Sequence, residues 1–273
     1  MQLRDFIPPI VVKLARRSKQ SQKTYNSYEE AQTVCASGYE EDDLANVVYE
    51  KTGVYRETLA KQNPFVAEIS SLRTLIGLIL AKHDNELNVI DFGGACSAHY
   101  FIAKVVFGER LKLRWHVVET PKMASKAVTL EDGQLKFFSD LQKARSDFDR
   151  VDLVFSSGAL QYVPQPYKFL EQLIECGADN IFITRVGLST SSRELVVLQT
   201  SNLSDNGPGP MPKGTRDRIV QYPVTFARKD KFEEIIRRRY SIDILFEEDK
   251  GSYQAANQPI DMYGYFGTLK NST

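Results

Sequence analysis

Short apolar runs alternate with helical segments along most of this chain, and this alternation limits its fold more than any other feature. The runs with strand character cover residues 88–92, 113–119, 135–138, 151–155 and 180–184. The helical segments before and between them cover about residues 64–79, 97–107, 124–128 and 167–176. Strands that alternate with helices in this way predict βαβ units, and hence an α/β fold with a parallel sheet between two layers of helices.

The end of the chain departs from this alternation. An amphipathic helix over residues 229–240 is followed by two more strand-like runs, 242–246 and 263–269. The polar gap between these runs, which contains Asn257 and Pro259, leaves no room for a crossover helix, so we expect an antiparallel pair at one edge. The whole pattern predicts a Rossmann-like, doubly wound, mostly parallel sheet of seven strands with an antiparallel C-terminal strand pair.

One segment interrupts the regular pattern. Residues 204–216 contain three glycines and three prolines in 13 positions, which excludes a helix or a central strand. A loop of this length inside a compact domain is usually a lid, a binding loop or disordered. Because it follows the fifth strand on the side of the strands' carboxyl ends, we expect a lid or substrate loop.

Composition excludes some classes of function. Of the 273 residues, 42% are hydrophobic and 11% aromatic, which is enough for a sizeable core. The 35 basic and 35 acidic residues cancel, which argues against a dedicated nucleic-acid binder. Cys35, Cys96 and Cys176 form no CxxC pair, so a reducing, cytoplasmic setting is expected, without a disulfide framework or a zinc site. No apolar run approaches the roughly 18–20 residues that span a bilayer, and no signal-peptide pattern is present.

Charge is unevenly distributed at the N-terminus. Residues 1–24 carry a net charge of +5, and residues 27–57 carry −6. The basic segment, with its apolar neighbours, suits packing across the body, packing on a partner chain in a homodimer, or weak contact with an anionic membrane surface. We therefore expect an N-terminal helical accessory segment over residues 1–60 and the main domain over residues 61–273.

The functional side chains are expected beyond the carboxyl ends of the strands, where ligands bind in open α/β sheets. The residues there with suitable chemistry are Asp91, Gly93, Gly94, Ala95, Glu119, Asp140, Leu141, Ser156, Ser157 and Gln161. Glu119, at the end of the second strand, suits a ribose diol, and the small residues 93–97 allow a ligand to approach the backbone. Structural roles compete with these: Asp91 as a helix cap, Asp140 as a surface charge, and Ser156 as a turn former.

These features resemble the S-adenosylmethionine-dependent class I methyltransferases over about residues 65–270. Asp91-x-Gly93 is similar to the start of their acid-x-Gly-x-Gly-x-Gly turn, with Ala95 and Ser97 at the second and third glycine positions. Residues 154–163 resemble their fourth-strand motif. More narrowly, the chain resembles a group of bacterial methyltransferases associated with surface-polysaccharide gene clusters, through the stretches 7–10, 28–31, 91–94 and 156–162.

The resemblance implies S-adenosylmethionine as the cofactor. Asp91 and the carbonyls of Ser156 and Ser157 would meet its ammonium, the backbone of residues 93–95 its methionine part, Glu119 its ribose, and Asp140 with Leu141 its adenine. The acceptor would be a small molecule or a sugar or glycan intermediate. Candidates for positioning this acceptor or taking its proton are His99, Gln161, Tyr162, Arg185 and Tyr222.

Two of these candidates have competing interpretations. His99 titrates in a range that suits proton transfer, but a histidine on a helix surface is the alternative. Arg185 ends the fifth strand, where a guanidinium needs either an anionic substrate or an acidic partner. His83 and His116 are interpreted as structural, and no cluster has metal-ligand spacing.

Two other functions remain open. A nicotinamide-dependent sugar-nucleotide enzyme would need G-x-G-x-x-G, whereas the chain from Gly93 reads Gly-Gly-Ala-Cys-Ser-Ala and departs from that pattern twice. A methyltransferase-like binding or scaffold protein without turnover would fit the incomplete glycine turn.

Overall fold

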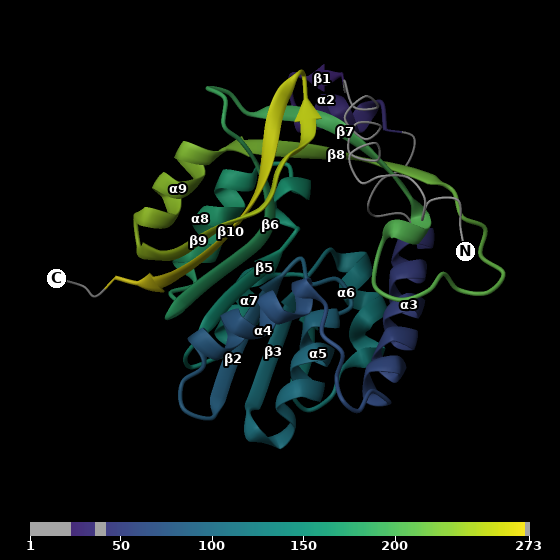
Figure 1. The fold of residues 1–273 in the computed structure, drawn as a ribbon, viewed down its shortest axis with the longest axis vertical. Helices are drawn as coiled ribbons and strands as arrows, with labels where there is room; N and C mark the ends of the chain where they lie inside the picture. The colour runs from purple at the N-terminus through teal and green to yellow at the C-terminus, as the bar shows by residue number, and fades with distance from the viewer. Residues whose placement is uncertain (1–22, 36–41, 271–273) are drawn as a thin grey trace.

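The computed structural model describes residues 23–35 and 42–270, and these form a sheet of ten strands with helices on both faces (Figure 1). Five strands are parallel: β2 (Glu86–Phe92), β3 (Lys112–Val118), β4 (Leu135–Phe138), β5 (Leu153–Ser157) and β6 (Asn180–Ser189). Their order in the sheet is β4-β3-β2-β5-β6, so the direction of winding reverses at β2. The predicted parallel α/β sheet is confirmed. The basic segment 1–24 lies almost wholly outside the described residues.

The expected C-terminal pair is also present. β9 (Tyr240–Ala255) and β10 (Gln258–Leu269) form a long hairpin, and β10 lies antiparallel between β6 and β9. Ala256 and Asn257 form the turn with φ of 49° and 61°, the left-handed backbone that two-residue hairpin turns require. The predicted seven strands therefore lie in the order β4-β3-β2-β5-β6-β10-β9.

The helices that are earlier in the sequence cover one face of the sheet, and the later helices cover the other face. One layer consists of α3 (Asp42–Ala60), α4 (Ile69–Ala81), α5 (Ala98–Phe107) and α6 (Pro121–Ala127), which share one hydrophobic cluster with the sheet. The other layer consists of α7 (Leu141–Ser146), α8 (Pro166–Glu175) and α9 (Lys229–Arg237). The expectation that Pro64 opens a helix is wrong, because α4 begins at Ile69 after an extended residue at its N-cap.

Three strands were not expected from the sequence. β7 (Leu195–Asn202) and β8 (Ile219–Arg228) form an antiparallel ribbon, and the short β1 (Thr24–Tyr25) pairs with β7. The end of β8 also pairs with the end of β6. The sheet is therefore larger than the seven strands predicted, because an insertion between β6 and α9 extends it beyond its carboxyl edge.

The ribbon of β7 and β8 has an inner and an outer face. Leu195, Val197, Val224 and Phe226 point inward into the cluster shared with α3 and α5. The short helix α2 (Tyr28–Thr33) packs on the ribbon, and the Cys35 thiol that follows it donates to a β8 carbonyl. The ribbon is thus enclosed between the core and the N-terminal segment.

The glycine- and proline-rich connection between β7 and β8 packs on α3. The Lys51 ammonium donates to the carbonyl of Ser204 at 2.5 Å, although Lys51 is only 2% exposed. A Cβ at Gly209 would lie 2.9 Å from the carbonyl oxygen of Lys51, so only glycine allows this approach. The connection is therefore fastened to a helix that lies about 150 residues earlier in the chain.

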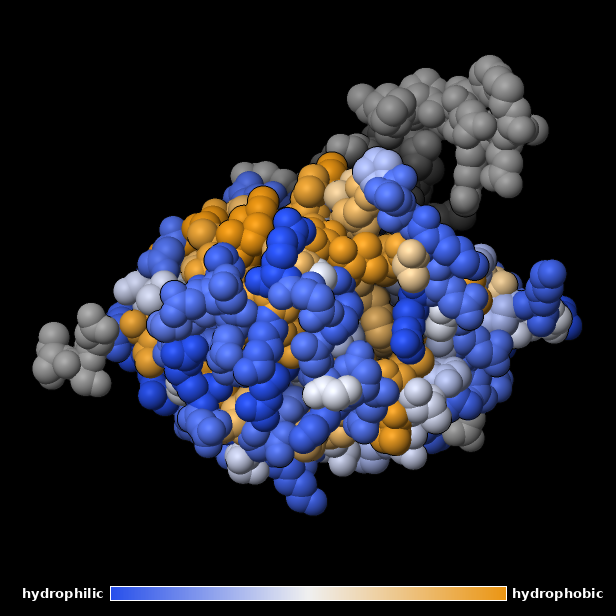
Figure 2. All heavy atoms as spheres, turned by 90° about the horizontal axis from the view of Figure 1, so that it is seen from below, coloured by the Kyte–Doolittle hydropathy of each residue, from blue (hydrophilic) through white to orange (hydrophobic). Residues whose placement is uncertain are grey.

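One side of α4 and its approach remains apolar and exposed. Val66, Ile69, Leu72, Ile76 and Ile79 are each at least 49% exposed. Seen from below, the molecule shows apolar residues gathered in the upper part of the view (Figure 2). Within the described ranges, no helix is both long and apolar enough to cross a membrane.

Two helical glycines give opposite predictions for stability. A Cβ at Gly77 in α4 would lie 2.2 Å from the buried Phe182 ring, so Gly77→Ala should lower the free energy of unfolding by about 1–3 kcal/mol. Gly53 in α3 has no atom within 4 Å of a Cβ, so Gly53→Ala should raise it by about 0.5–1 kcal/mol. Urea unfolding of both variants checks this, and equal effects would contradict the packing of α4.

Candidate functional site

The turn after β2 has the backbone of a glycine-rich loop. Gly93, Ala95 and Ser97 have φ of 71°, 48° and 66°, all in the left-handed region. At Gly93 a Cβ would lie 2.2 Å from that of Ala159, and at Gly94 it would lie 2.3 Å from an oxygen of Asp91. Ala95 and Ser97 thus keep the conformation of glycine at a cost of about 1–2 kcal/mol each. The turn presents bare backbone at the carboxyl edge of the sheet.

Asp91, at the end of β2, is fully buried. One carboxylate oxygen accepts a hydrogen bond from the Trp115 indole at 3.0 Å, and the other has no partner. Burial raises the pKa of Asp91 to about 7, the indole opposes the shift, and the charge of Glu119 adds to it. A cationic group beside this carboxylate would lower its pKa and stabilise the ionised form.

Glu119 links the turns that follow β2 and β3. One carboxylate oxygen accepts from the backbone N–H of Ala95 at 3.0 Å, and the other accepts from that of Thr120 at 2.8 Å. Its side chain is nearly buried, and the residue is 9% exposed. The carboxylate therefore fixes the left-handed turn against the next strand.

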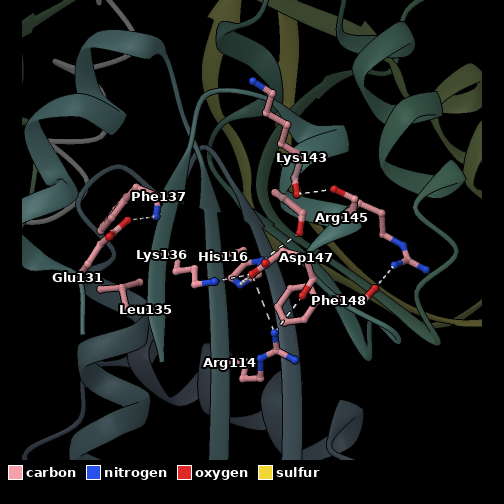
Figure 3. Close-up of polar contacts among 12 residues, drawn as sticks. Arg114, His116, Glu131, Leu135, Lys136, Phe137, Lys143, Arg145, Asp147 and Phe148 are labelled. Atoms are coloured by element: carbon pink, nitrogen blue, oxygen red, sulfur yellow. Dashed lines mark hydrogen bonds and ion pairs between the residues drawn. The ribbon is translucent and has the colours of Figure 1, made fainter. Parts of the chain in front are cut away.

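Asp140 and Leu141 lie at the start of α7, after β4. The Asp140 carboxylate accepts from the backbone N–H of Lys143 at 2.8 Å, so it caps the helix while remaining exposed. The other end of α7 is anchored by Asp147, whose carboxylate lies 2.7 Å from the Lys136 ammonium and 3.3 Å from the His116 ring (Figure 3). His116 is buried inside β3, in agreement with a structural role.

The last two residues of β5 and the segment that follows it carry the remaining predicted cofactor residues. The Ser156 hydroxyl donates to the carbonyl of Phe92 at 3.0 Å, and the Ser157 hydroxyl accepts from that of Thr184 at 2.9 Å. The Gln161 amide donates to the carbonyl of Arg185 at 3.2 Å, while its own carbonyl oxygen has no partner. Both serines thus join β5 to a neighbouring strand.

Buried polar atoms without partners concentrate at this edge. In the part of the chain that the structure describes, they include an oxygen of Asp91, the hydroxyl of Ser97 and the amide oxygen of Gln161. Native proteins leave few such atoms, and each needs an explanation such as a bound ligand or water. These three follow β2 and β5, at the reversal of the sheet, so they fit a ligand site there.

His99, in the first turn of α5, is held against α4. Its Nδ1 lies 3.2 Å from the hydroxyl of Thr74, and that hydroxyl also lies 3.2 Å from the carbonyl of Ser70. Burial lowers the pKa of His99 to about 4, and the charge of Arg185 adds to the shift. At neutral pH the imidazole is therefore uncharged, and its pKa lies below the range expected from the sequence.

Tyr162 and Tyr222 meet between the sheet and the ribbon of β7 and β8. Their rings lie 5.4 Å apart edge to face, and the Tyr162 hydroxyl donates to the Gln199 amide oxygen at 3.2 Å. The hydroxyl of Tyr222 lies 3.0 Å from that of Ser201. Burial raises the pKa of both tyrosines, that of Tyr222 to about 12, so both hydroxyls are neutral.

The structure brings the acceptor-side candidates together from distant elements. Arg185 is exposed in the middle of β6, which continues to Ser189, so the prediction that Arg185 ends this strand is wrong. Its charge acts on both His99 and Tyr162. Thr74, Gln199, Ser201 and Glu248 contact these residues but were not predicted. These four residues belong to no motif. The sequence offered a signal only for Glu248, which belongs to an acidic pair at residues 247–248 on an edge strand.

No protein-family model and no curated protein matches this sequence. Among solved structures, the N-terminal domain of EvdMO1 with SAH bound is 8% identical, covering 97% of this chain and 98% of that one at a TM-score of 0.44. An S-adenosylmethionine-dependent methyltransferase from Clostridium acetobutylicum ATCC 824 is 8% identical, with coverage of 80% and 99% and a TM-score of 0.45. The DhpI-SAM-HEP complex is 13% identical, with coverage of 89% and 99% and a TM-score of 0.42. None of these similarities assigns the chain to a family.

The left-handed backbone at Ala95 predicts opposite effects for two substitutions. Ala95→Gly should raise the free energy of unfolding by about 1 kcal/mol, because glycine adopts this φ without strain. Ala95→Val should lower it, because a β-branched residue is strongly disfavoured there. Chemical denaturation of the two variants is the measurement, and a loss of stability in Ala95→Gly would contradict the turn conformation.

The raised pKa of Asp91 predicts a pH-dependent stability. Between its unfolded value of 3.8 and about 7, the native state binds the extra proton, so this group makes stability fall as pH rises through that window. Asp91→Asn should therefore gain stability relative to the parent between pH 5 and 8, by on the order of 2 kcal/mol. Denaturation at several pH values tests this, with exposed Asp84→Asn as control. Parallel curves for Asp91→Asn and the parent would contradict it.

Proposed function

We propose that this protein is an S-adenosylmethionine-dependent methyltransferase that acts on a small molecule or on a sugar or glycan intermediate in the cytoplasm. The observation that carries the proposal is the turn after β2, which keeps three left-handed residues although only the first is glycine. Strain of this kind persists where the surroundings enforce it, and such residues cluster at ligand sites. The hydrogen bond from Ala95 to Glu119 provides that enforcement.

The residues present fit the cofactor. The ionisable Asp91 and the carbonyls of Ser156 and Ser157 suit an ammonium. Gly93 and Gly94 pack tightly against Ala159 and the Asp91 carboxylate, and this lets the turn offer its backbone to the methionine part of the cofactor. The remaining residues that would hold it are Ala95, Glu119, Asp140, Leu141 and Gln161. When bound, S-adenosylmethionine supplies a methyl group on a sulfonium.

Residues on the acceptor side supply proton transfer and exclusion of water. His99 takes the proton of the acceptor atom, and its contact with Thr74 fixes the ring for this role. The ribbon of β7 and β8 covers this region, and its Tyr222 meets Tyr162 at the edge of the sheet. The ribbon and the connection that follows β7 thus act as the lid expected from the sequence.

The inner face of the ribbon supports a hydroxyl-rich acceptor. Gln199, Ser201, Tyr162 and Tyr222 offer neutral donors and acceptors in one connected group. Such groups match the hydroxyls of a sugar, and this agrees with a role in surface-polysaccharide synthesis.

Calorimetric titration with S-adenosylmethionine tests the proposal. The parent should bind it, and Glu119→Ala should weaken the affinity at least about tenfold, on the order of 1.4 kcal/mol, by removing the ribose acceptor and loosening the turn. Glu86→Ala, at the opposite end of β2, is the matched control and should bind like the parent. Absence of binding by the parent at millimolar concentration would overturn the proposed function. Equal affinities of Glu119→Ala and the parent would overturn the role of Glu119.

A further inference from the structure

Arg185 combines a strained backbone with an exposed side chain. Its φ is 55°, in the left-handed region, although it lies within β6 and neither is a glycine nor sits in a turn. A non-glycine residue in this conformation costs on the order of 1–3 kcal/mol and persists only where its surroundings impose it. The register between β6 and β10 shifts here, so Arg185 lies in a β-bulge, where a left-handed residue can occur.

Two side chains from different elements form hydrogen bonds with the backbone of Arg185. The Glu248 carboxylate on β9 accepts from its N–H at 2.6 Å, and the Gln161 amide donates to its carbonyl at 3.2 Å. Both hydrogen bonds involve the main chain of Arg185, so they leave the charge of its side chain unpaired. These two contacts hold the bulged backbone, and the guanidinium lies near Gly158, just after β5.

The acid that reaches Arg185 is already paired elsewhere. The second oxygen of Glu248 forms an ion pair with Arg73 on α4, and the first accepts the backbone N–H. Among the residues that the structure describes, no carboxylate forms an ion pair with the Arg185 guanidinium. The exposed guanidinium is therefore available to an anion from outside the chain, which it can bind through two parallel hydrogen bonds.

The guanidinium lies within the proposed acceptor region. A Cβ at Gly158, just after β5, would lie 3.5 Å from the central carbon of the guanidinium, so the side chain extends over bare backbone. Burial is the main cause that lowers the pKa of His99 and raises that of Tyr162. The charge of Arg185 has a smaller effect and lowers both pKa values. The Arg185 guanidinium therefore lies near His99, the proposed base, and near Tyr162.

We propose that Arg185 forms an anion subsite for the acceptor, which carries a carboxylate or a phosphate near the atom that is methylated. This inference rests on the proposed function, because it describes the acceptor of the same site. The planar guanidinium binds either anion through two parallel hydrogen bonds, which fixes orientation as well as position. The nearby Glu248 carboxylate is paired with Arg73, so among the described residues no carboxylate takes up the charge of the guanidinium.

Chemical modification of arginines tests the subsite without knowledge of the acceptor. Phenylglyoxal is applied to the full chain, and the rate at each arginine is followed by peptide mass spectrometry with about 50 mM inorganic phosphate, acetate or chloride at equal ionic strength. Phosphate or acetate should slow modification of Arg185 about threefold or more relative to chloride. Arg110, at the opposite end of the sheet, is the control and should react equally in all three. The anion that protects more identifies phosphate or carboxylate as the group.

Thermal unfolding provides a second test. Phosphate or acetate, whichever protects, should raise the Tm of the parent and of Arg110→Met more than that of Arg185→Met. Arg185→Lys should keep part of the effect, because it retains the charge but not the paired hydrogen bonds. Equal reactivity of Arg185 in all three salts, or equal Tm shifts in Arg185→Met and the parent, would overturn the subsite. The titration with S-adenosylmethionine is a separate measurement, so failure of the proposed function and failure of the anion subsite are distinguishable.

Discussion

The carboxylate of Glu119 is the interaction on which the rest of the site depends. By accepting from Ala95 and Thr120, it holds together the two turns that follow β2 and β3. The turn after β2 could not keep its left-handed residues without such compensation, because neither Ala95 nor Ser97 prefers that backbone. The same turn closes over Asp91 and keeps its carboxylate away from water. One buried acid thus sustains both the strain and the perturbed pKa beside it.

Much of the framework could be predicted from the sequence because its determinants are local. Apolar runs and helical spacing place the five parallel strands, and the polar gap before 263–269 indicates the hairpin of β9 and β10. The ribbon of β7 and β8 escaped prediction because its pairing joins segments across a glycine- and proline-rich connection. Its apolar inner face packs against α3, which lies far away in the sequence.

The candidate site divides in the same way. Residues that end a strand, such as Asp91 and Glu119, could be located because the parallel sheet brings all such ends to one edge. Thr74 and Glu248 could not, because their contacts with His99 and Arg185 arise from the packing of α4 and β9 over the sheet. At Arg185 the sequence left two partners open, and only the pairing of Glu248 with Arg73 distinguishes them.

The bond from Lys51 to Ser204 has a consequence for how the protein is made. A buried ammonium needs this carbonyl, and the carbonyl belongs to an insertion that leaves the ribosome about 150 residues later. A chain interrupted before this segment would therefore hold the Lys51 ammonium in α3 without the carbonyl that it contacts in the complete fold.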